Sequence, residues 1–464
     1  MRNTAFALFF GNRGFFPGEV IAEARKRLAS ACENNGYGYI MMDEALTRYG
    51  AVETISEGKL FAKFLEDNKG KYDGVILSLP NFGDENGAAV ALKDVDVPIL
   101  VHAFPDELDK MDFAHRRDSM CGKMAMCNVL RQMDIKYTLT EKFCTDPLSE
   151  DFANDLKKFA AICRVYKGMR SFNIGAIGAR TTAFKTVRYD EIALQRRRIN
   201  IETIDMTMVF AMMDKVDEKK LSAKKEKYSS LASFGTYPPE KLENISRLGV
   251  VIDELIERYD LQAVAIRCWD ELQKTYGIAP CLILGELNER GIAASCELDI
   301  SNAIMMRAIY LATDYPVVLL DVNNNYGDCD NKVIFFHCGP APASFMKGKG
   351  EIKEHLMFKK TYGDGSGVGI NKGECIACDV TVGSLKTENG EICTFVTEGR
   401  LTDDTLPEVF FGFGTVFEKD NAQKMLEYMA SNGYRHHVAL SKGSFASVIT
   451  EAFDKYLGYK IDRI

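Results

Sequence analysis

The sequence contains two carboxylates and a small set of histidines whose types and positions suit the binding of a divalent metal ion. The carboxylates are Glu297 and Asp321, and the histidines are His337 and the adjacent pair His436 and His437. Only six histidines occur in the chain, so this grouping is informative. Mixed oxygen and nitrogen ligands suit Mn²⁺, Fe²⁺ or Co²⁺ better than they suit a closed structural zinc site. We therefore predict a metal centre with coordination positions open for two oxygens of a substrate.

Both carboxylates lie where an apolar run ends. Glu297 follows the small apolar residues 293–296, and Asp321 follows the apolar run 316–320. A carboxylate that ends a buried parallel strand points into the crevice in which α/β proteins bind their ligands. The residue types alone also allow a helix-start role for Glu297, a loop-capping role for Asp321 and a surface turn at the two adjacent histidines.

The first third of the chain predicts an open parallel sheet covered by helices, because apolar, strand-like stretches alternate with stretches of helical spacing. The strand-like stretches are residues 4–10, 37–42, 72–79 and 97–103, and the helical ones are residues 18–34, 55–65 and 150–167. We assign residues 1–170 to an N-terminal α/β domain.

The same pattern starts again after residue 170, and the last part of the chain differs from it. Further buried strands are expected at residues 171–177, 201–204, 263–266 and 317–320. We assign residues 171–345 to a second α/β domain that carries the two carboxylates, and residues 346–464 to a smaller β-rich domain with helices. The predicted fold class is α/β, with two open parallel-sheet (Rossmann-like) domains followed by a β-rich C-terminal domain.

Turn residues and spacing predict two elements of the β-rich part. Residues 375–385 and 392–397 alternate around Asn389-Gly390, and Asn-Gly between alternating runs is a strong hairpin signal. Residues 416–429 have the spacing of one amphipathic helix.

The composition limits the class of protein. The chain has 464 residues, which at roughly 150 residues per domain gives about three domains. Its 58 Lys and Arg against 66 Asp and Glu give a net charge of −8, which does not favour binding to nucleic acid or to an anionic membrane. The 13 cysteines form no dense framework, which favours a reducing compartment. Apolar runs are shorter than the ~18 residues of a membrane span. We expect a cytoplasmic protein with no membrane or nucleic-acid partner.

Arginine and asparagine side chains are expected in the loops that follow the predicted strands. Arg13, Asn81, Arg116 and Arg117 lie in such loops of the first domain, and Arg180 follows the first strand of the second domain. Arginine forks bind carboxylate, phosphate or sulfonate groups. These loops predict a substrate site in which an anionic substrate is one option. The alternative for Arg116 and Arg117 is a role at the surface or in a subunit contact.

Parts of the sequence resemble known sugar isomerases. Residues 295–299 (Ser-Cys-Glu-Leu-Asp) and 318–322 (Val-Leu-Leu-Asp-Val) are similar to the metal-binding core of the L-fucose isomerase family, in which the two carboxylates have the same separation of 24 residues. His337 and the pair His436-His437 are similar to the histidine positions of the related L-arabinose isomerase family.

The resemblance implies a divalent-metal-dependent aldose–ketose isomerase that acts through an ene-diolate. It makes Glu297, Asp321 and His437 metal ligands and His337 a further ligand, while His436 is either the alternative to His437 or a substrate-binding residue. The implied ion is Mn²⁺, with Co²⁺, Fe²⁺ or Mg²⁺ as alternatives. Because aldose–ketose exchange moves one proton between C1 and C2, Glu297 and Asp321 are also our candidates for the acid/base pair.

The resemblance leaves the sugar open between a neutral deoxy-hexose or pentose and an acidic sugar such as sulfoquinovose. It implies a homo-oligomer, a trimer or hexamer, in which the first domain of a neighbouring subunit completes the pocket. Two other functions remain compatible with the residues. One is a sugar-binding protein without catalysis, and the other is a metal-dependent aldolase or lyase that uses the same ene-diolate chemistry.

Overall fold

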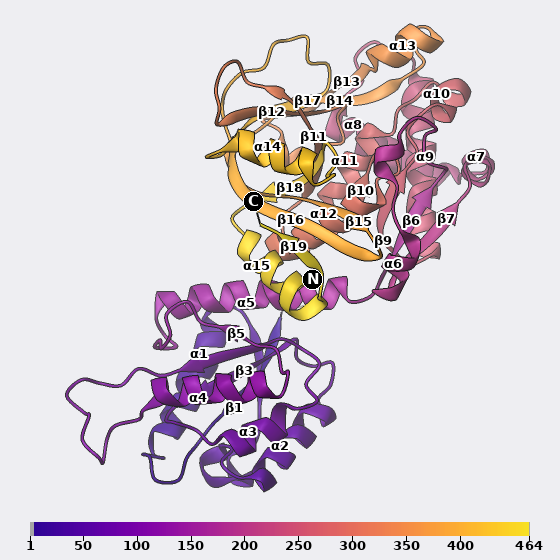
Figure 1. Ribbon diagram of the computed structural model, residues 1–464. Helices are drawn as coiled ribbons and strands as arrows, with labels where there is room; N and C mark the ends of the chain where they lie inside the picture. The colour runs from indigo at the N-terminus through magenta and orange to yellow at the C-terminus, as the bar shows by residue number, and fades with distance from the viewer. Residues whose placement is uncertain (1–3, 464) are drawn as a thin grey trace. The chain divides into compact units, whose positions relative to one another are not determined.

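The computed structural model describes residues 4–463 of the chain (Figure 1). Two compact units make up the chain: Met1–Lys167 with Glu451–Gly458, and Gly168–Thr450 with Tyr459–Ile464. The predicted fold class is confirmed, because two of the sheets are parallel α/β sheets and a larger mixed sheet occupies the C-terminal region. No helix within residues 4–463 is long and apolar enough to cross a lipid bilayer.

The first unit is built on a five-stranded parallel sheet in the order β2-β1-β3-β4-β5. The strands are β1 (Ala5–Phe10), β2 (Gly38–Met41), β3 (Gly74–Leu79), β4 (Ile99–Ala103) and β5 (Thr138–Leu139). The helices are α1 (Val20–Asn34), α2 (Ile55–Asp67), α3 (Glu85–Leu92), α4 (Ser119–Gln132) and α5 (Glu150–Met169). Neighbouring residues of a strand point to opposite faces, so Ala7 and Phe9 join the core under α2, α3 and α4, while Phe6 and Leu8 join the core under α1 and α5.

The second unit contains a four-stranded parallel sheet in the order β10-β9-β6-β7. Its strands are β6 (Phe172–Ile177), β7 (Ile199–Ile204), β9 (Leu261–Ile266) and β10 (Ala293–Ser295), and its helices include α7 (Met206–Met213), α8 (Glu218–Leu231), α9 (Pro239–Arg258) and α11 (Cys281–Glu289). Leu248, Val251 and Leu255 of α9 repeat at helical spacing, so they lie on one face of the helix and enter the same core as Val264 of β9.

A ten-stranded mixed sheet completes the second unit, in the order β19-β16-β15-β18-β11-β12-β17-β14-β13-β8. Its bounds are β8 (Ala232–Ser233), β11 (Val317–Asn325), β12 (Lys332–His337), β13 (Gly350–Glu354), β14 (Val368–Glu374), β15 (Cys378–Glu388), β16 (Glu391–Leu401), β17 (Phe413–Glu418), β18 (His437–Lys442) and β19 (Lys460–Asp462). The predicted hairpin is confirmed: β15 and β16 pair antiparallel, and Asn389 (φ 52) and Gly390 (φ 77) have the positive φ angles of a type I′ turn.

The strand expected at residues 317–320 belongs to a different sheet from the one predicted. It forms the first part of β11, which pairs antiparallel with β12 and β18. β11 continues to Asn325, so Asp321 lies within a strand and does not end a parallel one. A strand covered on both faces is apolar in either type of sheet, so the apolar run does not reveal its partners.

The single helix expected at residues 416–429 is also wrong. These residues form the end of β17 and most of α14 (Ala422–Ser431), separated by Asn421 at φ 60. Thr415, Val416 and Phe417 are β-branched or aromatic, which favours a strand in this part of the segment.

Helix α12 (Ile300–Thr313) joins the two sheets of the second unit. It packs against β9 and β10 of the parallel sheet and against β15 and β18 of the ten-stranded sheet. Its side chains are buried on all sides, including Ile304, Met305 and Ile309. A helix that is apolar all round is typical of a protein interior. The N-terminus of α12 lies where residues from the two sheets meet, because Asn302 Nδ2 donates to the carbonyl oxygen of His437 at 3.3 Å.

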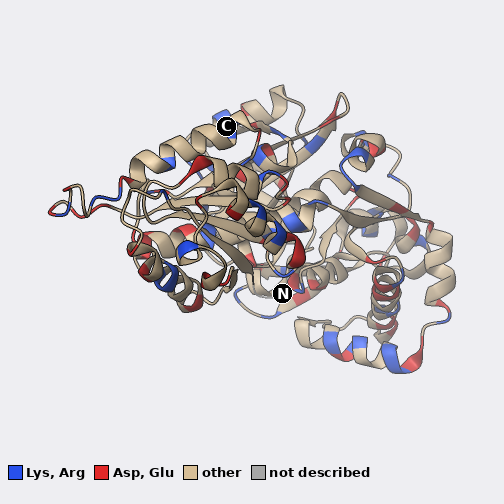
Figure 2. Cartoon of the chain, turned by 90° about the horizontal axis from the view of Figure 1, so that it is seen from below, with Lys and Arg blue, Asp and Glu red and all other residues tan. Residues whose placement is uncertain are grey.

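Charged residues of both signs share the helix surfaces of the chain. In Figure 2, Lys and Arg are interspersed with Asp and Glu along the helices. The lysine-rich helix α8 is an example, because Lys220 lies 2.6 Å from Glu254 of α9 and Lys224 lies 2.5 Å from Asp253. Lys220 and Lys224 of α8 are therefore paired within the second unit.

Candidate active site

Asp321 and His437 face each other across two antiparallel strands. In the register of β11 and β18, Asp321 is directly opposite His437. Asp321 Oδ1 lies 3.3 Å from His437 Nε2 and 3.8 Å from His436 Nε2. The His437 side chain is 1% exposed and the His436 side chain is 41% exposed. His437 is therefore the buried member of the histidine pair.

Glu297 reaches the same place from the four-stranded parallel sheet. It follows β10 in a turn in which Glu297 (φ 52) and Leu298 (φ 62) both adopt the left-handed backbone region. Residues other than glycine rarely adopt this region, and such strain is concentrated at functional sites. The turn is held by a hydrogen bond from Leu298 N to the carbonyl oxygen of Ile266 at 3.1 Å. Glu297 Oε2 consequently lies 3.4 Å from His437 Nε2 and 3.6 Å from His337 Nε2.

His337 ends β12 and supplies another buried imidazole. The backbone N–H of Cys338 donates to Nδ1 of His337 at 2.8 Å. A neutral imidazole that accepts at Nδ1 carries its proton on Nε2. The Nε2 atom that faces Glu297 is thus a hydrogen-bond donor in the neutral ring.

In His437 the imidazole proton lies on Nδ1 and not on Nε2, because Nδ1 contacts Asp299. The sequence did not single out Asp299. Asp299 Oδ2 lies 2.8 Å from His437 Nδ1, and the same carboxylate forms a buried salt bridge with Arg435. An ionised carboxylate at Nδ1 places the imidazole proton on Nδ1 and leaves the lone pair of Nε2 free. Asp299 also accepts a hydrogen bond from Asn302 N at 3.1 Å, as the N-cap of α12. In the sequence, Asp299 ends the segment 295–299 and has the residue type of a helix cap, and neither signal identifies a partner for a distant histidine.

The charges of this cluster stabilise one another. Burial raises the pKa of Glu297, but the nearby imidazoles of His337 and His437 outweigh burial, so the pKa lies below its ordinary value. Burial lowers the pKa of His437, but the hydrogen bond with Asp299 and the carboxylates of Asp321 and Glu297 outweigh burial and raise it. Glu297 is therefore held in the ionised form that binds cations.

Three polar atoms in this cluster are buried and have no hydrogen-bond partner within residues 4–463. They are Glu297 Oε2, Asp321 Oδ1 and His337 Nε2. Leaving such an atom unpaired costs about 1–3 kcal/mol, so buried polar atoms are normally satisfied. Atoms of Glu297, His337 and His437 lie within 4.8 Å of one another, as do atoms of Asp321, His436 and His437. The residues therefore fit a divalent cation, because ligand atoms about 2.1 Å from one ion lie a few ångströms from one another.

Arg180 lies in the loop that follows β6, and this loop reaches the histidine pair. Its guanidinium group donates to the carbonyl oxygens of Thr181 (3.2 Å) and Thr182 (3.4 Å). The ring of Phe184, from the same loop, has its centroid 5.7 Å from that of His436 and 5.9 Å from that of His437. Phe184 therefore covers both histidines, a contact for which the sequence offers no signal.

Arg13 and Asn81 organise the carboxyl ends of strands in the first unit. The Arg13 guanidinium forms a salt bridge with Glu85 and lies 4.1 Å from the centroid of the Phe82 ring. Asn81 is fully buried, and its Nδ2 atom donates to Asn12 Oδ1 at 2.8 Å.

Arg116 and Arg117 lie in the loop that follows β4 of the same unit. Arg116 forms a salt bridge with Asp118 at 2.8 Å, and its side chain is 47% exposed. The backbone N–H of Arg117 donates to Asp106 at 2.6 Å, and its guanidinium group donates to the carbonyl oxygen of Pro80 at 3.4 Å. Each of these arginines therefore keeps part of its donor capacity for a ligand.

The chain is similar to known sugar isomerases. Residues 7–170 match the model of the fucose/sulfoquinovose isomerase N-terminal domain, and residues 335–464 match that of the L-fucose isomerase C-terminal domain. Over 391 residues the chain is 23% identical to the sulfoquinovose isomerase of Priestia megaterium, an alignment that covers 84% of this chain and 85% of the relative. It is 22% identical over 332 residues to the sulfoquinovose isomerase of a Clostridium species, covering 71% of this chain and 72% of the relative. A further sulfoquinovose isomerase, from Alkalicoccus urumqiensis, is 21% identical over 392 residues, with 84% and 85% covered.

Proposed function

Because this chain belongs to the L-fucose isomerase family and is a sugar aldose–ketose isomerase, we propose that it requires a divalent metal ion and that its substrate is an anionic aldose. The relatives from Priestia, Alkalicoccus and Clostridium are named for sulfoquinovose, a sugar with a sulfonate group, so sulfoquinovose is the first candidate substrate.

The observation that carries the metal requirement is the convergence of buried, unpaired ligand atoms from two sheets. We assign three ligand positions to Glu297, Asp321 and His437, because Nε2 of His437 has a free lone pair while Asp299 binds its Nδ1 atom. His337 is the weaker candidate for a fourth ligand, since the Cys338 amide leaves a proton on its Nε2 atom. A bound ion, for which Mn²⁺ is the first candidate and Co²⁺, Fe²⁺ and Mg²⁺ are alternatives, would act as a Lewis acid for the two vicinal substrate oxygens.

The side chains of the centre have separate tasks in the proton transfer. Isomerisation removes a proton from one of the carbons C1 and C2 and returns a proton to the other. A carboxylate has two oxygens, so Glu297 and Asp321 can each bind the ion through one oxygen and take up or return that proton through the other. The N–H at Nε2 of His337 can donate to a substrate oxygen as its charge develops.

Two groups of polar residues are assigned to substrate binding in this proposal. Arg180 and His436 of the second unit would bind the substrate of their own chain, and Arg13, Asn81, Arg116 and Arg117 of the first unit would serve the pocket of a neighbouring subunit. The donors that these arginines retain suit sugar hydroxyls or an anionic group. The exposed loop of Arg116 also carries Leu108 and Phe113, whose side chains are 94% and 84% exposed. Burial of this loop against a neighbouring subunit would support the expected homo-oligomer, a trimer or hexamer with a shared pocket.

The test is a substrate panel assayed with and without metal. Sulfoquinovose, glucose 6-phosphate, glucuronate, glucose, L-fucose and L-arabinose would each be incubated with the metal-stripped protein and with the protein supplied with Mn²⁺. We expect ketose formation from sulfoquinovose that depends on added Mn²⁺, measured by NMR spectroscopy. A highest kcat/KM for an uncharged sugar would contradict the anionic substrate, and full turnover by the stripped protein would contradict the metal requirement.

A further inference from the structure

A cavity of about 320 Å³ lies at the carboxyl ends of β6 and β7 in the second unit. Gly178 and Arg180 line it from the loop after β6, Arg188 and Tyr189 line it from further along the same segment, and Thr203 and Leu298 complete the wall. In open α/β sheets this edge is the usual place for a ligand. Arg188 and Tyr189 were not singled out in the sequence, because they lie well beyond the end of the strand.

The described lining of the cavity carries two positive charges and no negative one. Arg180 and Arg188 both line it, and the described residues that line it include no carboxylate. The guanidinium groups donate only to backbone carbonyl groups among the hydrogen bonds described: Arg180 to Thr181 and Thr182, and Arg188 Nε to Lys185 at 3.2 Å. Two guanidinium groups without a balancing carboxylate favour an anion, above all one with several oxygens.

The cavity adjoins the proposed metal centre. Leu298, which lines the cavity, is the residue after Glu297 and shares its left-handed turn. Phe184, which lies on the histidine pair, belongs to the segment between Arg180 and Arg188. One segment therefore contributes both the arginines of the cavity and the aromatic cover of the histidines.

This segment is held in place at its beginning. Arg267 Nη1 donates to the carbonyl oxygens of Ala179 (3.1 Å) and Arg180 (3.4 Å), and Arg267 Nε donates to Glu271 at 2.6 Å. Gly178 has φ 88, and a Cβ atom there would lie 2.8 Å from the Cβ atom of Arg267, so the close approach requires glycine. A site fixed in this way loses little freedom when it binds a ligand.

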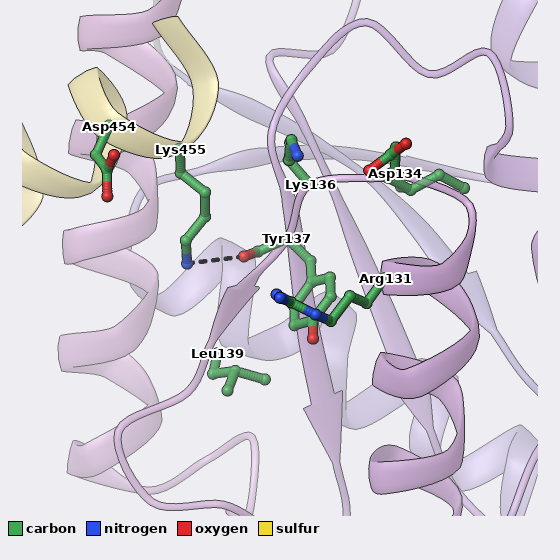
Figure 3. Close-up of a pocket in the computed structure, with 8 residues that line it drawn as sticks. Arg131, Asp134, Lys136, Tyr137, Leu139, Asp454 and Lys455 are labelled. Carbon is green, nitrogen blue, oxygen red and sulfur yellow. Dashed lines mark hydrogen bonds between the residues drawn. The ribbon is translucent and has the colours of Figure 1, made fainter. Parts of the chain in front are cut away.

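A cavity of the first unit provides a contrast. It has a volume of about 670 Å³, and its lining includes the cations Arg131, Lys136 and Lys455 as well as the acids Asp134 and Asp454 (Figure 3). Lys455 Nζ already donates to the carbonyl oxygen of Tyr137 at 2.9 Å. With both charge signs in its wall, that cavity has no clear preference for the charge of a ligand.

We propose that the cavity of Arg180 and Arg188 binds the anionic group of the substrate, at the end of the sugar away from the reacting carbons. The ligand chemistry is an oxyanion, that is, a sulfonate, phosphate or carboxylate on an aldose. Besides the two guanidinium groups, Tyr189 and Thr203 would supply hydroxyl donors to the bound oxyanion. This inference rests on the proposed function, and it makes the two arginines specificity-determining residues that leave the proton transfer to other side chains.

The experiment compares Arg180→Met and Arg188→Met with the matched control Lys185→Met, which removes a charge from the same segment at a residue outside the cavity lining. The substrates are sulfoquinovose, glucose 6-phosphate, glucuronate and glucose. Hydrogen bonds to charged groups contribute enough to predict a loss of about 10- to 100-fold in kcat/KM for the preferred anionic sugar in each arginine variant. We expect this loss mainly in KM, and a smaller loss of activity on glucose, which has no anionic group. The anionic sugar with the highest wild-type kcat/KM identifies the oxyanion.

A second readout separates this inference from the proposed function. Calorimetry measures the affinity of the same variants for sulfoquinovose without any turnover. If the wild-type protein binds sulfoquinovose but does not isomerise it, and both arginine variants bind it at least about tenfold more weakly, the proposed function fails and the anion site stands. If the arginine variants match Lys185→Met in both affinity and kcat/KM, or if activity on glucose falls as much as activity on the anionic sugar, the anion site is wrong.

Discussion

Oδ2 of Asp299 lies 2.8 Å from Nδ1 of His437, and Oδ1 of the same carboxylate forms a salt bridge with Arg435. All three side chains are at most 4% exposed. One buried carboxylate thus orients a proposed metal ligand and neutralises a buried guanidinium group. Carboxylates in this position hold the imidazole tautomer that binds metal, and their loss typically weakens metal binding by about 10- to 100-fold.

We expect Asp299→Asn to reduce both Mn²⁺ affinity and stability. Affinity should fall by about 10- to 100-fold, as measured by calorimetric titration. The free energy of unfolding should fall by about 3–5 kcal/mol, because the charge of Arg435 stays buried without its partner. Urea denaturation of the metal-free protein measures this second effect separately.

The matched control is Asp205→Asn. Asp205 also caps a helix, since its side chain accepts a hydrogen bond from Thr207 N at 2.7 Å at the start of α7. Asparagine is as good an N-cap as aspartate, so this variant should change stability little. Equal effects of the two substitutions would mean that Asp299 acts only as a helix cap.

Replacing either carboxylate of the centre should stop turnover without unfolding the protein. We expect kcat to fall by at least about 100-fold in Glu297→Gln and in Asp321→Asn, since each removes a group that can carry a proton. The measurements are ketose formation with saturating Mn²⁺ and circular dichroism for the fold. Glu257→Gln, which changes an exposed glutamate of α9, is the control. Near-normal kcat in either test variant would exclude that carboxylate from the proton transfer.

The two adjacent histidines should respond differently to metal. A ligand that binds only the folded state stabilises it by about 2.7 kcal/mol at a concentration 100 times its Kd. We therefore expect Mn²⁺ to raise the Tm of the wild-type protein and of His436→Ala, and not that of His437→Ala. Differential scanning fluorimetry in the presence and absence of Mn²⁺ provides the measurement. The reverse pattern would assign the ligand to His436.

The buried ammonium group of Lys123, in α4 of the first unit, should make the stability of the protein depend on pH. Burial lowers the pKa of Lys123 to about 8, and its ammonium group donates to Thr140 Oγ1 (2.6 Å) and to the carbonyl oxygen of Phe143 (2.7 Å). The unfolded chain keeps the ordinary pKa near 10.4. Between these values the unfolded state binds more protons, so stability rises with pH by at most about 1.4 kcal/mol per pH unit. Lys123→Met should lose this contribution, as urea denaturation at pH 8, 9 and 10 would reveal. If the free energy of unfolding changed equally with pH in the wild-type protein and in Lys123→Met, the amine of Lys123 would not be desolvated.

Most strands of the two parallel sheets were predictable, because apolar runs bounded by polar loops are a direct consequence of burial on both faces; the two-residue strand β5 was not predicted. The hairpin at Asn389-Gly390 was predictable because its turn requires positive φ angles that these two residues tolerate. The partners of residues 317–320 were not predictable, since an apolar run is compatible with either type of sheet. The prediction of one helix over residues 416–429 was wrong because only the second half of the segment forms a helix. The helical spacing of that half made the strand in the first half hard to recognise.

Within the candidate site, residue type was more informative than position. Glu297, Asp321 and the histidines stood out because carboxylates and imidazoles are uncommon beside apolar runs. Asp299 and Phe184 contact residues that are far away in the sequence, and Arg188 lines a cavity that only the folded chain forms. From residue type alone, Asp299 could equally be a helix cap, Phe184 a core residue and Arg188 a surface cation.

The position of α12 has a consequence for assembly. The helix packs on both sheets of the second unit, and the proposed ligands come from either side of it: Glu297 follows a strand of the parallel sheet, and Asp321 and His437 belong to the ten-stranded sheet. Neither sheet alone contains a complete set of ligands. The centre can therefore form only when both sheets are packed on the helix, and an ion bound there would slow their separation.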